Sequence, residues 1–414
     1  MADIQTIDHR LAGSEVLAPS VVRPAAAGKP KFAYVDCLRG YAVLMVIINH
    51  VTYAIPQLPY RAHQLGAFGW HGVQLFFLAS CITLLMSSSY ERDRTGRMSA
   101  GNFFIRRFLR IAPMYYLAAL LYWVMFPNAQ ANLIKLLASL SFVNAWHPVT
   151  TTTTGDWQVV PGGWSIGVEF TFYFLFPLFI SFVTTFRRAA LALFLAVIVG
   201  ALVDSYAMAP LTAKYGAVAA DNFLYYWFFN QASVFALGAV AFFTIRAIES
   251  RPDLRLTRML REKGGAVLVL SLLLLLLIAV APLPFGHQLM WRFAFPQFLA
   301  ASSGFFLFIL AMSQSSNRFL INRVIAGIGK VSFSAYLLHF AVIKLVMIDH
   351  AEFFHIHDTG WSAIVAFICS ILVVTVVTCL MSAVTYTLIE KPMMRLAKRL
   401  TRGPAPAAQM VPLT

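Results

Sequence analysis

The chain has 414 residues, of which 59% are hydrophobic and 12% are charged, and its formal net charge is +15. Soluble globular proteins carry about 25% charged residues and about 45–50% apolar residues. The composition therefore excludes an ordinary soluble protein and indicates an integral membrane protein. The positive charge does not indicate nucleic-acid binding, because the basic residues lie between apolar segments, as they do in membrane proteins.

Largely apolar runs of about 20 residues, the length that crosses a bilayer, recur along the chain. They predict an all-α polytopic protein with about ten transmembrane helices, at residues 36–55, 70–89, 111–127, 164–184, 189–205, 223–245, 266–282, 294–313, 331–348 and 361–389. Residues 130–147 predict an interfacial or short helix. The predicted membrane domain covers residues 32–396, between a disordered tail at 1–31, which lacks the apolar core of a signal peptide, and a second tail at 397–414.

The distribution of lysine and arginine predicts the orientation of these helices. With the N-terminus placed in the cytoplasm, 27 of the 32 basic residues fall in cytoplasmic segments, 4 fall in outer segments, and Lys344 lies within a span. Such a bias is typical of cytoplasmic loops. It predicts an even number of spans, with both termini cytoplasmic, in the inner (cytoplasmic) membrane of the cell.

The first predicted span places a guanidinium group and an imidazole on one helix face. Arg39 and His50 are eleven residues apart, which is about 1100° of helix, roughly 20° more than three turns, and about 16 Å along the axis. Arg39 is then near the cytoplasmic surface and His50 near the middle of the membrane. A snorkelling arginine and a hydrogen-bonded core histidine are the structural alternative, but two aligned polar residues at this depth favour a functional role.

A basic cluster, Arg106, Arg107 and Arg110, comes just before the third predicted span. Arg107 and Arg110 share a helix face, and arginine clusters suit phosphate groups through charge-assisted hydrogen bonds. The alternative is that these residues only fix the topology of the span.

Further polar side chains fall inside later spans. Glu169 lies one helical turn after Ser165 and one turn before Tyr173, and a carboxylate at this depth must be paired, protonated or functional. Tyr336 and His339 form a further candidate polar site, with packing and a hydrogen bond as the structural alternative.

The cysteines and the outer-loop histidines give weaker signals. The four cysteines, Cys37, Cys81, Cys369 and Cys379, lie in or beside apolar runs without a CxxC motif, which predicts neither a disulfide nor a thiol nucleophile. The outer-loop histidines His350, His355 and His357 lie near acidic residues, but their spacing is not that of a metal site, and we predict no metal.

Together these segments resemble the membrane acyltransferase-3 family, whose members O-acylate surface polysaccharides, lipid-linked sugars and some antibiotics. The segments that carry the resemblance are the pair Arg39 and His50, Gly72 to Ser80, Arg106 to Pro113, Trp164 to Tyr173, Ser332 to His339, and Glu390-Lys391-Pro392. Their order is that of the family, and they run through the whole membrane domain. Cys81 is a departure, because the family usually has glycine after the serine.

The resemblance implies an acyl-CoA donor on the cytoplasmic side and a carbohydrate or glycolipid hydroxyl as acceptor, with acetyl as the commonest group. No permanently bound cofactor is expected. Arg39, Arg106, Arg107 and Arg110 are then candidates for binding the CoA phosphates, and the extended pantetheine arm is roughly as long as the separation of Arg39 and His50. His50 is the candidate general base, and Glu169 or another polar partner would orient its ring. A transient acyl-histidine is an alternative.

Two other functions fit the same pattern of spans. A transporter or flippase for a lipid-linked sugar or small solute also needs many helices and buried polar residues. A scaffolding membrane protein would need Arg39, His50 and Glu169 only for folding. Binding of CoA distinguishes the enzyme from both alternatives.

Overall fold

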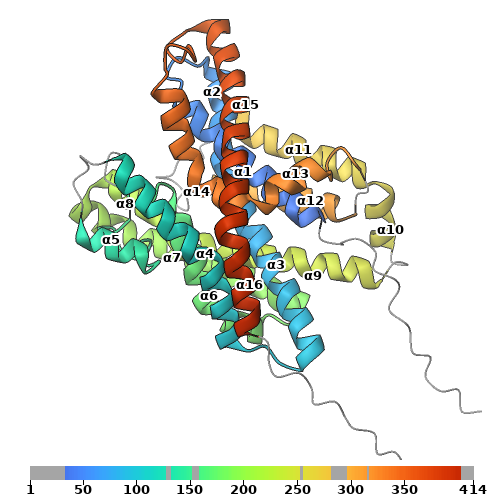
Figure 1. Cartoon of the computed structure of the whole chain (residues 1–414). Coiled ribbons are helices and arrows are strands. Elements are labelled where there is room, and N and C mark those ends of the chain that lie inside the picture. The colour runs from blue at the N-terminus through green and yellow to red at the C-terminus, as the bar shows by residue number, and fades with distance from the viewer. Residues whose placement is uncertain are drawn as a thin grey trace, which may run out of the picture. The chain divides into compact units, whose positions relative to one another are not determined.

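The computed structural model describes residues 33–126, 132–151, 158–251, 255–280, 296–314 and 317–401, all within one compact unit of the chain. Within these ranges every regular element is a helix and none is a strand, which confirms the all-α prediction (Figure 1). The predicted tail at 1–31 lies outside the described residues, as do Arg292, Arg402 and the last residues of the chain. The predicted C-terminal tail begins inside a helix, which continues to Leu400.

Among the described residues, eight single helices or continuous runs of helices are long and apolar enough to cross a membrane, which confirms a polytopic membrane protein. They are α1 (Ala33–Tyr53); α2 (Tyr60–Ala67) with η1 (Phe68–His71) and α3 (Gly72–Thr95); α4 (Ala100–Met125); α6 (Gly163–Phe182); α7 (Phe186–Tyr215); α8 (Ala217–Tyr226) with α9 (Phe228–Ser250); α12 (Gln297–Gln314); and α15 (Gly360–Thr385) with η4 (Tyr386–Glu390) and α16 (Lys391–Leu400).

The two remaining predicted spans, at 266–282 and 331–348, fall on a shorter helix and on a bent pair of helices. A bent pair supplies a ninth candidate span: α13 (Arg323–Lys330) meets α14 (Ser332–Val342), which continues as η3 (Ile343–Ile348), at an angle of 79°. The apolar helix α11 (Gly264–Val280) has 17 residues and coincides with most of the span predicted at 266–282. The short helix predicted near residues 130–147 is α5 (Leu133–Leu140), and α10 (Arg255–Glu262) is a second short helix.

Helix α4 begins eleven residues before the span that the sequence predicts at 111–127. The Ser99 hydroxyl caps it by accepting a hydrogen bond from the backbone N–H of Asn102. A helix of 26 residues is about 39 Å long, whereas the hydrocarbon core is about 30 Å thick. The arginine cluster is therefore part of a regular helix, and its side chains take fixed directions around that helix.

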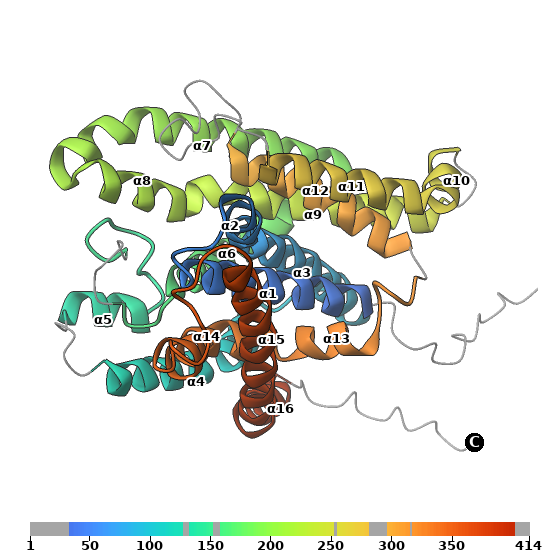
Figure 2. The ribbon, with the colours of Figure 1, turned by 90° about the horizontal axis from the view of Figure 1, so that it is seen from above.

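The bundle is built around α1, which packs against α3 and also against α13 and α14, while α3 in turn packs against α9 (Figure 2). Glycine allows α1 and α13 to touch: a side chain at Gly329 would overlap the Asp36 carbonyl, and one at Gly40 would overlap the Ile325 carbonyl. The Tyr41 hydroxyl also donates to the Leu320 carbonyl at 2.9 Å. Because α13 is fixed in this way, the bend after it sets where α14 begins.

The contact between α1 and α13 gives a test of the fold. Replacing Gly329→Ala forces a methyl group against the backbone of Asp36 and is expected to destabilise the protein by about 1–3 kcal/mol. The matched variant Gly327→Ala lies on the same short helix, where an added Cβ meets nothing within 4 Å. It is expected to match or exceed the wild-type stability, because alanine favours helices over glycine by about 1 kcal/mol. Thermal unfolding in detergent measures both, and equal midpoints would contradict this packing.

Candidate active site

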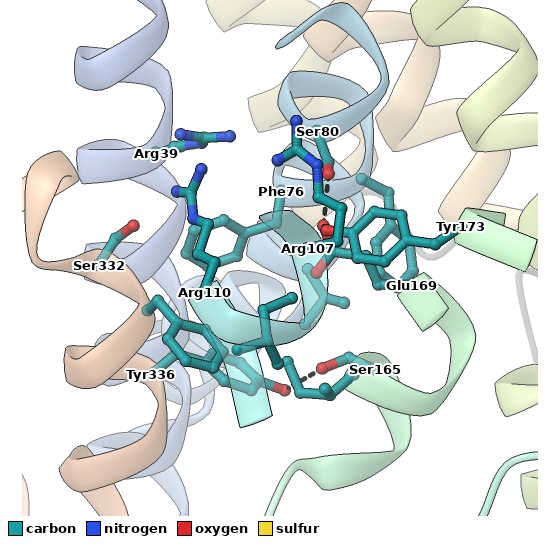
Figure 3. Close-up of a pocket in the computed structure, with 15 residues that line it drawn as sticks. Arg39, Phe76, Ser80, Arg107, Arg110, Ser165, Glu169, Tyr173, Ser332 and Tyr336 are labelled. Atoms are coloured by element: carbon teal, nitrogen blue, oxygen red, sulfur yellow. Dashed lines mark hydrogen bonds between the residues drawn. The ribbon is translucent and has the colours of Figure 1, made fainter. Parts of the chain in front are cut away.

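A cavity of about 620 Å³, its opening included, lies among α1, α3, α4, α6 and α14 (Figure 3). Its lining residues are Arg39 of α1; Val73, Phe76, Phe77 and Ser80 of α3; Arg107, Arg110 and Ile111 of α4; Ser165, Ile166, Glu169 and Tyr173 of α6; and Ser332, Phe333 and Tyr336 of α14. Figure 3 shows the guanidinium groups gathered at one end and the hydroxyls of Ser165 and Tyr336 at the other. Seven residues that the sequence singled out therefore meet in one cavity.

The cationic end of the cavity holds three guanidinium groups, those of Arg39, Arg107 and Arg110. Arg39 and Arg110 repel each other, as do Arg107 and Arg110. Within the described part of the chain, no carboxylate lies within ion-pair distance of any of them. Asp36 and Glu390 attract Arg110, and Asp36 also attracts Arg39, from beyond that distance. Like charges gathered without a direct ion pair favour the binding of an anionic ligand.

The individual arginines are held by neutral neighbours. The Arg39 guanidinium donates to the Thr83 hydroxyl at 3.2 Å. Arg107 stacks against the rings of Phe103 and Tyr173, at 5.7 and 5.8 Å from the ring centroids. Its buried Nε has no hydrogen-bond partner among the described residues. Aromatic stacking holds the charge in place and leaves its N–H donors for a ligand.

Glu169 is the carboxylate of the cavity wall. It accepts hydrogen bonds from the Ser80 hydroxyl and, at 2.6 Å, from the Tyr173 hydroxyl one turn further along α6. Arg39 and Arg107 attract it across the cavity. The cavity therefore has an excess of two positive charges when all four groups are ionised.

The other end of the cavity is closed by two hydroxyl groups. The Ser165 hydroxyl donates to the Tyr336 hydroxyl at 2.8 Å, and the Tyr336 hydroxyl donates to the Gly162 carbonyl at 2.9 Å. The Ser165 oxygen also lies 3.1 Å from that carbonyl oxygen. Gly162 precedes α6 with φ = 74°, a backbone conformation that favours glycine. A side chain there would also press on the Tyr336 hydroxyl.

His50 and His339 lie behind Tyr336 and do not line the cavity. The rings of Tyr336 and His339 are 5.8 Å apart, and those of His339 and His50 are 5.1 Å apart, measured between centroids. His50 also packs on Phe340 at 4.2 Å. Helix α1 therefore directs Arg39 into the cavity and His50 onto α14, where the ring of His339 lies near both the His50 ring and the cavity-lining Tyr336 ring.

The contacts of two residues, Arg106 and Glu169, differ from the roles that the sequence predicts for them. Arg106 does not line the cavity, and its guanidinium pairs with the Glu91 carboxylate at 2.5 Å. Arg106 lies about 100° from Arg107 but only about 40° from Arg110 around the helix, so its ion pair with Glu91, and not its helical direction, keeps it out of the cavity. Glu169, predicted to orient His50, is instead bonded to Ser80 and Tyr173, because α6 holds it at the depth of Arg39.

Several site residues were not predicted. Val73, Phe76, Phe77 and Ser80 follow the spacing i, i+3, i+4, i+7, which marks one helix face, and Thr83 continues it. The segment from Gly72 to Ser80 carried part of the family resemblance, but no role was predicted for its residues, although Ser80 interrupts an apolar run. Glu390 is 2% exposed and accepts a hydrogen bond from Ser334 of α14, so it ties η4 to the helix that carries Tyr336 and His339.

The outer-loop histidines do not form a metal site in the part of the chain that the structure describes. No group of three or more His, Cys, Asp and Glu side chains with suitable positions occurs there. His355 lies 3.4 Å from the Asp358 carboxylate, as a single exposed pair.

A comparison with protein families identifies the domain that contains this cavity. The family described as an acyltransferase domain matches residues 32–383, which include every helix that lines the cavity. The chain belongs to this acyltransferase family. The match runs from α1 nearly to the end of α15, so the cavity lies within the acyltransferase domain itself.

Curated relatives of this acyltransferase domain are distant. The O-acetyltransferase OatA of Staphylococcus aureus (strain NCTC 8325 / PS 47) is 24% identical over 377 residues, which are 86% of this chain and 56% of that protein. Acyltransferase MdmB of Streptomyces mycarofaciens is 26% identical over 424 residues, 96% of this chain and 99% of its own. The peptidoglycan O-acetyltransferase OatA of Listeria monocytogenes is 28% identical over 158 residues, 35% of this chain and 24% of its own. No solved structure matches the chain.

Proposed function

We propose that this protein is a membrane O-acyltransferase that moves an acetyl group from acetyl-CoA to a hydroxyl of a carbohydrate. The observation that carries the proposal is the cavity of an acyltransferase domain in which Arg39, Arg107 and Arg110 meet, with no carboxylate of the described residues in a direct ion pair with any of them. Such a group of guanidiniums suits the phosphates of a CoA thioester. The relatives named O-acetyltransferases support the acetyl group, and the one named for peptidoglycan supports a carbohydrate acceptor.

The donor would enter the cavity with its phosphates at the cationic end. Its extended arm would point along α1, from Arg39 toward His50, a path of about 16 Å for eleven helical residues. Tyr336 lines the cavity and its ring lies 5.8 Å from that of His339, so a rotation of this side chain would open a path for the thioester toward the two imidazoles. The positive-inside distribution supports an orientation with the cationic end of the cavity on the cytoplasmic side of the inner membrane, where acetyl-CoA is available, and with both termini in the cytoplasm.

The proposed reaction needs one base and no external cofactor. His50 would take the proton of the acceptor hydroxyl as its oxygen attacks the acyl carbon. The C–O bond forms, the C–S bond breaks, and the CoA thiolate takes up the proton. A neutral imidazole suits this step because one of its ring nitrogens is a proton acceptor.

The test is direct transfer by the purified protein. The full chain in lipid nanodiscs, given radiolabelled acetyl-CoA and glycans from the native cell surface, is expected to release free CoA and to label the glycan. Mass spectrometry should find the mass increment of an acetyl group on that glycan. A protein that binds no CoA and moves a solute unchanged across vesicles would be a transporter and would overturn the proposal.

A further inference from the structure

His339 has an unused hydrogen-bond acceptor in the interior of the bundle. Its Nδ1 lies 2.7 Å from the Tyr336 carbonyl oxygen. A carbonyl can only accept, so Nδ1 carries the proton, and in the neutral ring Nε2 is then an acceptor. The residue is fully buried, and Nε2 has no hydrogen-bond partner in the described part of the chain. An unmet buried acceptor is costly, and such groups are rare enough to need an explanation.

The ring of His50 is the polar group beside His339 that can explain this unmet acceptor. The two ring centroids are 5.1 Å apart and the planes are inclined by 32°. A ring-to-ring N–H···N bond of about 2.9 Å, with each nitrogen about 1.15 Å from its centroid, needs a centroid separation of about 5.2 Å. The two rings are therefore already at the distance of such a bond, and a turn of the His50 ring about its side-chain torsion aligns the nitrogens.

The backbone of α14 around His339 is held firmly. The Tyr122 hydroxyl of α4 donates to the Leu337 carbonyl at 2.7 Å and accepts from the Ala341 N–H at 3.2 Å. Tyr122 thus bridges the two sides of the turn that carries His339. Phe340 packs on both imidazoles, at 4.2 Å from each ring centroid. An acceptor held this rigidly can fix the orientation of a neighbouring side chain.

We propose that His339 is a positioning residue for His50, an inference that rests on the proposed acyl transfer. Its Nε2 accepts a hydrogen bond from the Nε2–H of His50, and the other His50 nitrogen, Nδ1, which lies 3.5 Å from the Asn49 side-chain amide nitrogen, takes the hydroxyl proton once that long contact opens. The same bond stabilises the imidazolium of His50 while it holds that proton. In hydrolytic triads a carboxylate does this for the catalytic histidine; here Glu169 is engaged elsewhere, and a second imidazole takes its place.

The kinetic test compares two substitutions at His339. His339→Leu removes the acceptor and is expected to lower kcat about 10- to 100-fold, the value of a hydrogen bond to a charged group, with KM for acetyl-CoA unchanged. His339→Gln places an amide oxygen near the position of Nε2 and is expected to recover part of the rate. Equal losses in the two variants, or a change in KM alone, would make His339 a packing residue and overturn the inference.

A second measurement does not depend on acyl transfer. Diethyl pyrocarbonate modifies unprotonated imidazole nitrogens, and peptide mass spectrometry follows His50 alone. The inference predicts that His50 reacts several-fold more slowly in His339→Leu than in the wild type, with His339→Gln between them. An unchanged rate overturns the inference. A wild-type protein that transfers no acetyl group, yet shows the expected order of His50 reactivity, overturns only the proposed function.

Discussion

Substituting His50→Ala should abolish acyl transfer while leaving the binding of acetyl-CoA intact. Removing a general base costs about 100- to 10,000-fold in rate. His50 does not line the cavity where the donor phosphates would bind, so the affinity for CoA should change little. Transfer of labelled acetyl groups measures the rate, and equilibrium binding of CoA measures the affinity, in the same nanodisc preparation.

The control for this substitution is His355→Ala, at an exposed histidine between η3 and α15 whose side chain is 67% accessible. It should transfer acetyl groups at the wild-type rate. Both variants must elute as the wild type does in size-exclusion chromatography. His50→Ala with full turnover would remove His50 from the mechanism, and with it the proposed path along α1.

The sequence predicts much of this site because a single helix has a known geometry. The 3.6-residue repeat puts Arg39 and His50 on one face of the first span, and the structure keeps both in one unbroken helix, α1. The same repeat groups Arg107 with Arg110 and Glu169 with Tyr173, and both pairs do meet in the cavity. Arg106 was grouped with its neighbours by charge, and it is its ion pair with Glu91 of α3, which no local pattern encodes, that keeps it out of the cavity.

The rest of the site depends on contacts between helices, which no local pattern encodes. Glu169 meets Ser80 from a helix 89 positions away, and Ser165 meets Tyr336 across 171 positions. The 79° bend before Ser332, which sets the depth of Tyr336 and His339, follows from the close contact of α1 and α13. An apolar run across residues 331–348 predicts a helix there but not its direction. The pairing of two histidines on helices distant in sequence was invisible for the same reason.

The double substitution Arg107→Gln with Arg110→Gln should weaken the binding of acetyl-CoA about 100-fold or more. Each guanidinium can form a charge-assisted bond to phosphate, worth about 1.5–3 kcal/mol. Both residues line the cavity on one face of α4, and no carboxylate among the described residues pairs with either. Glutamine keeps length and polarity, so the loss reports mainly the charge.

The matched control removes two positive charges from outside the cavity. Arg106 pairs with Glu91, and Arg188 bonds to Thr184 and the Phe182 carbonyl at the surface. Arg106→Gln with Arg188→Gln changes the net charge by the same amount, and it should alter the affinity for CoA by less than about threefold, as expected for screened charges at a distance. Isothermal titration of both proteins with CoA at two salt concentrations separates the cases. An equal loss of affinity in both double variants would mean that CoA is attracted by the overall positive charge of the protein. The cationic end of the cavity would then not be its binding site.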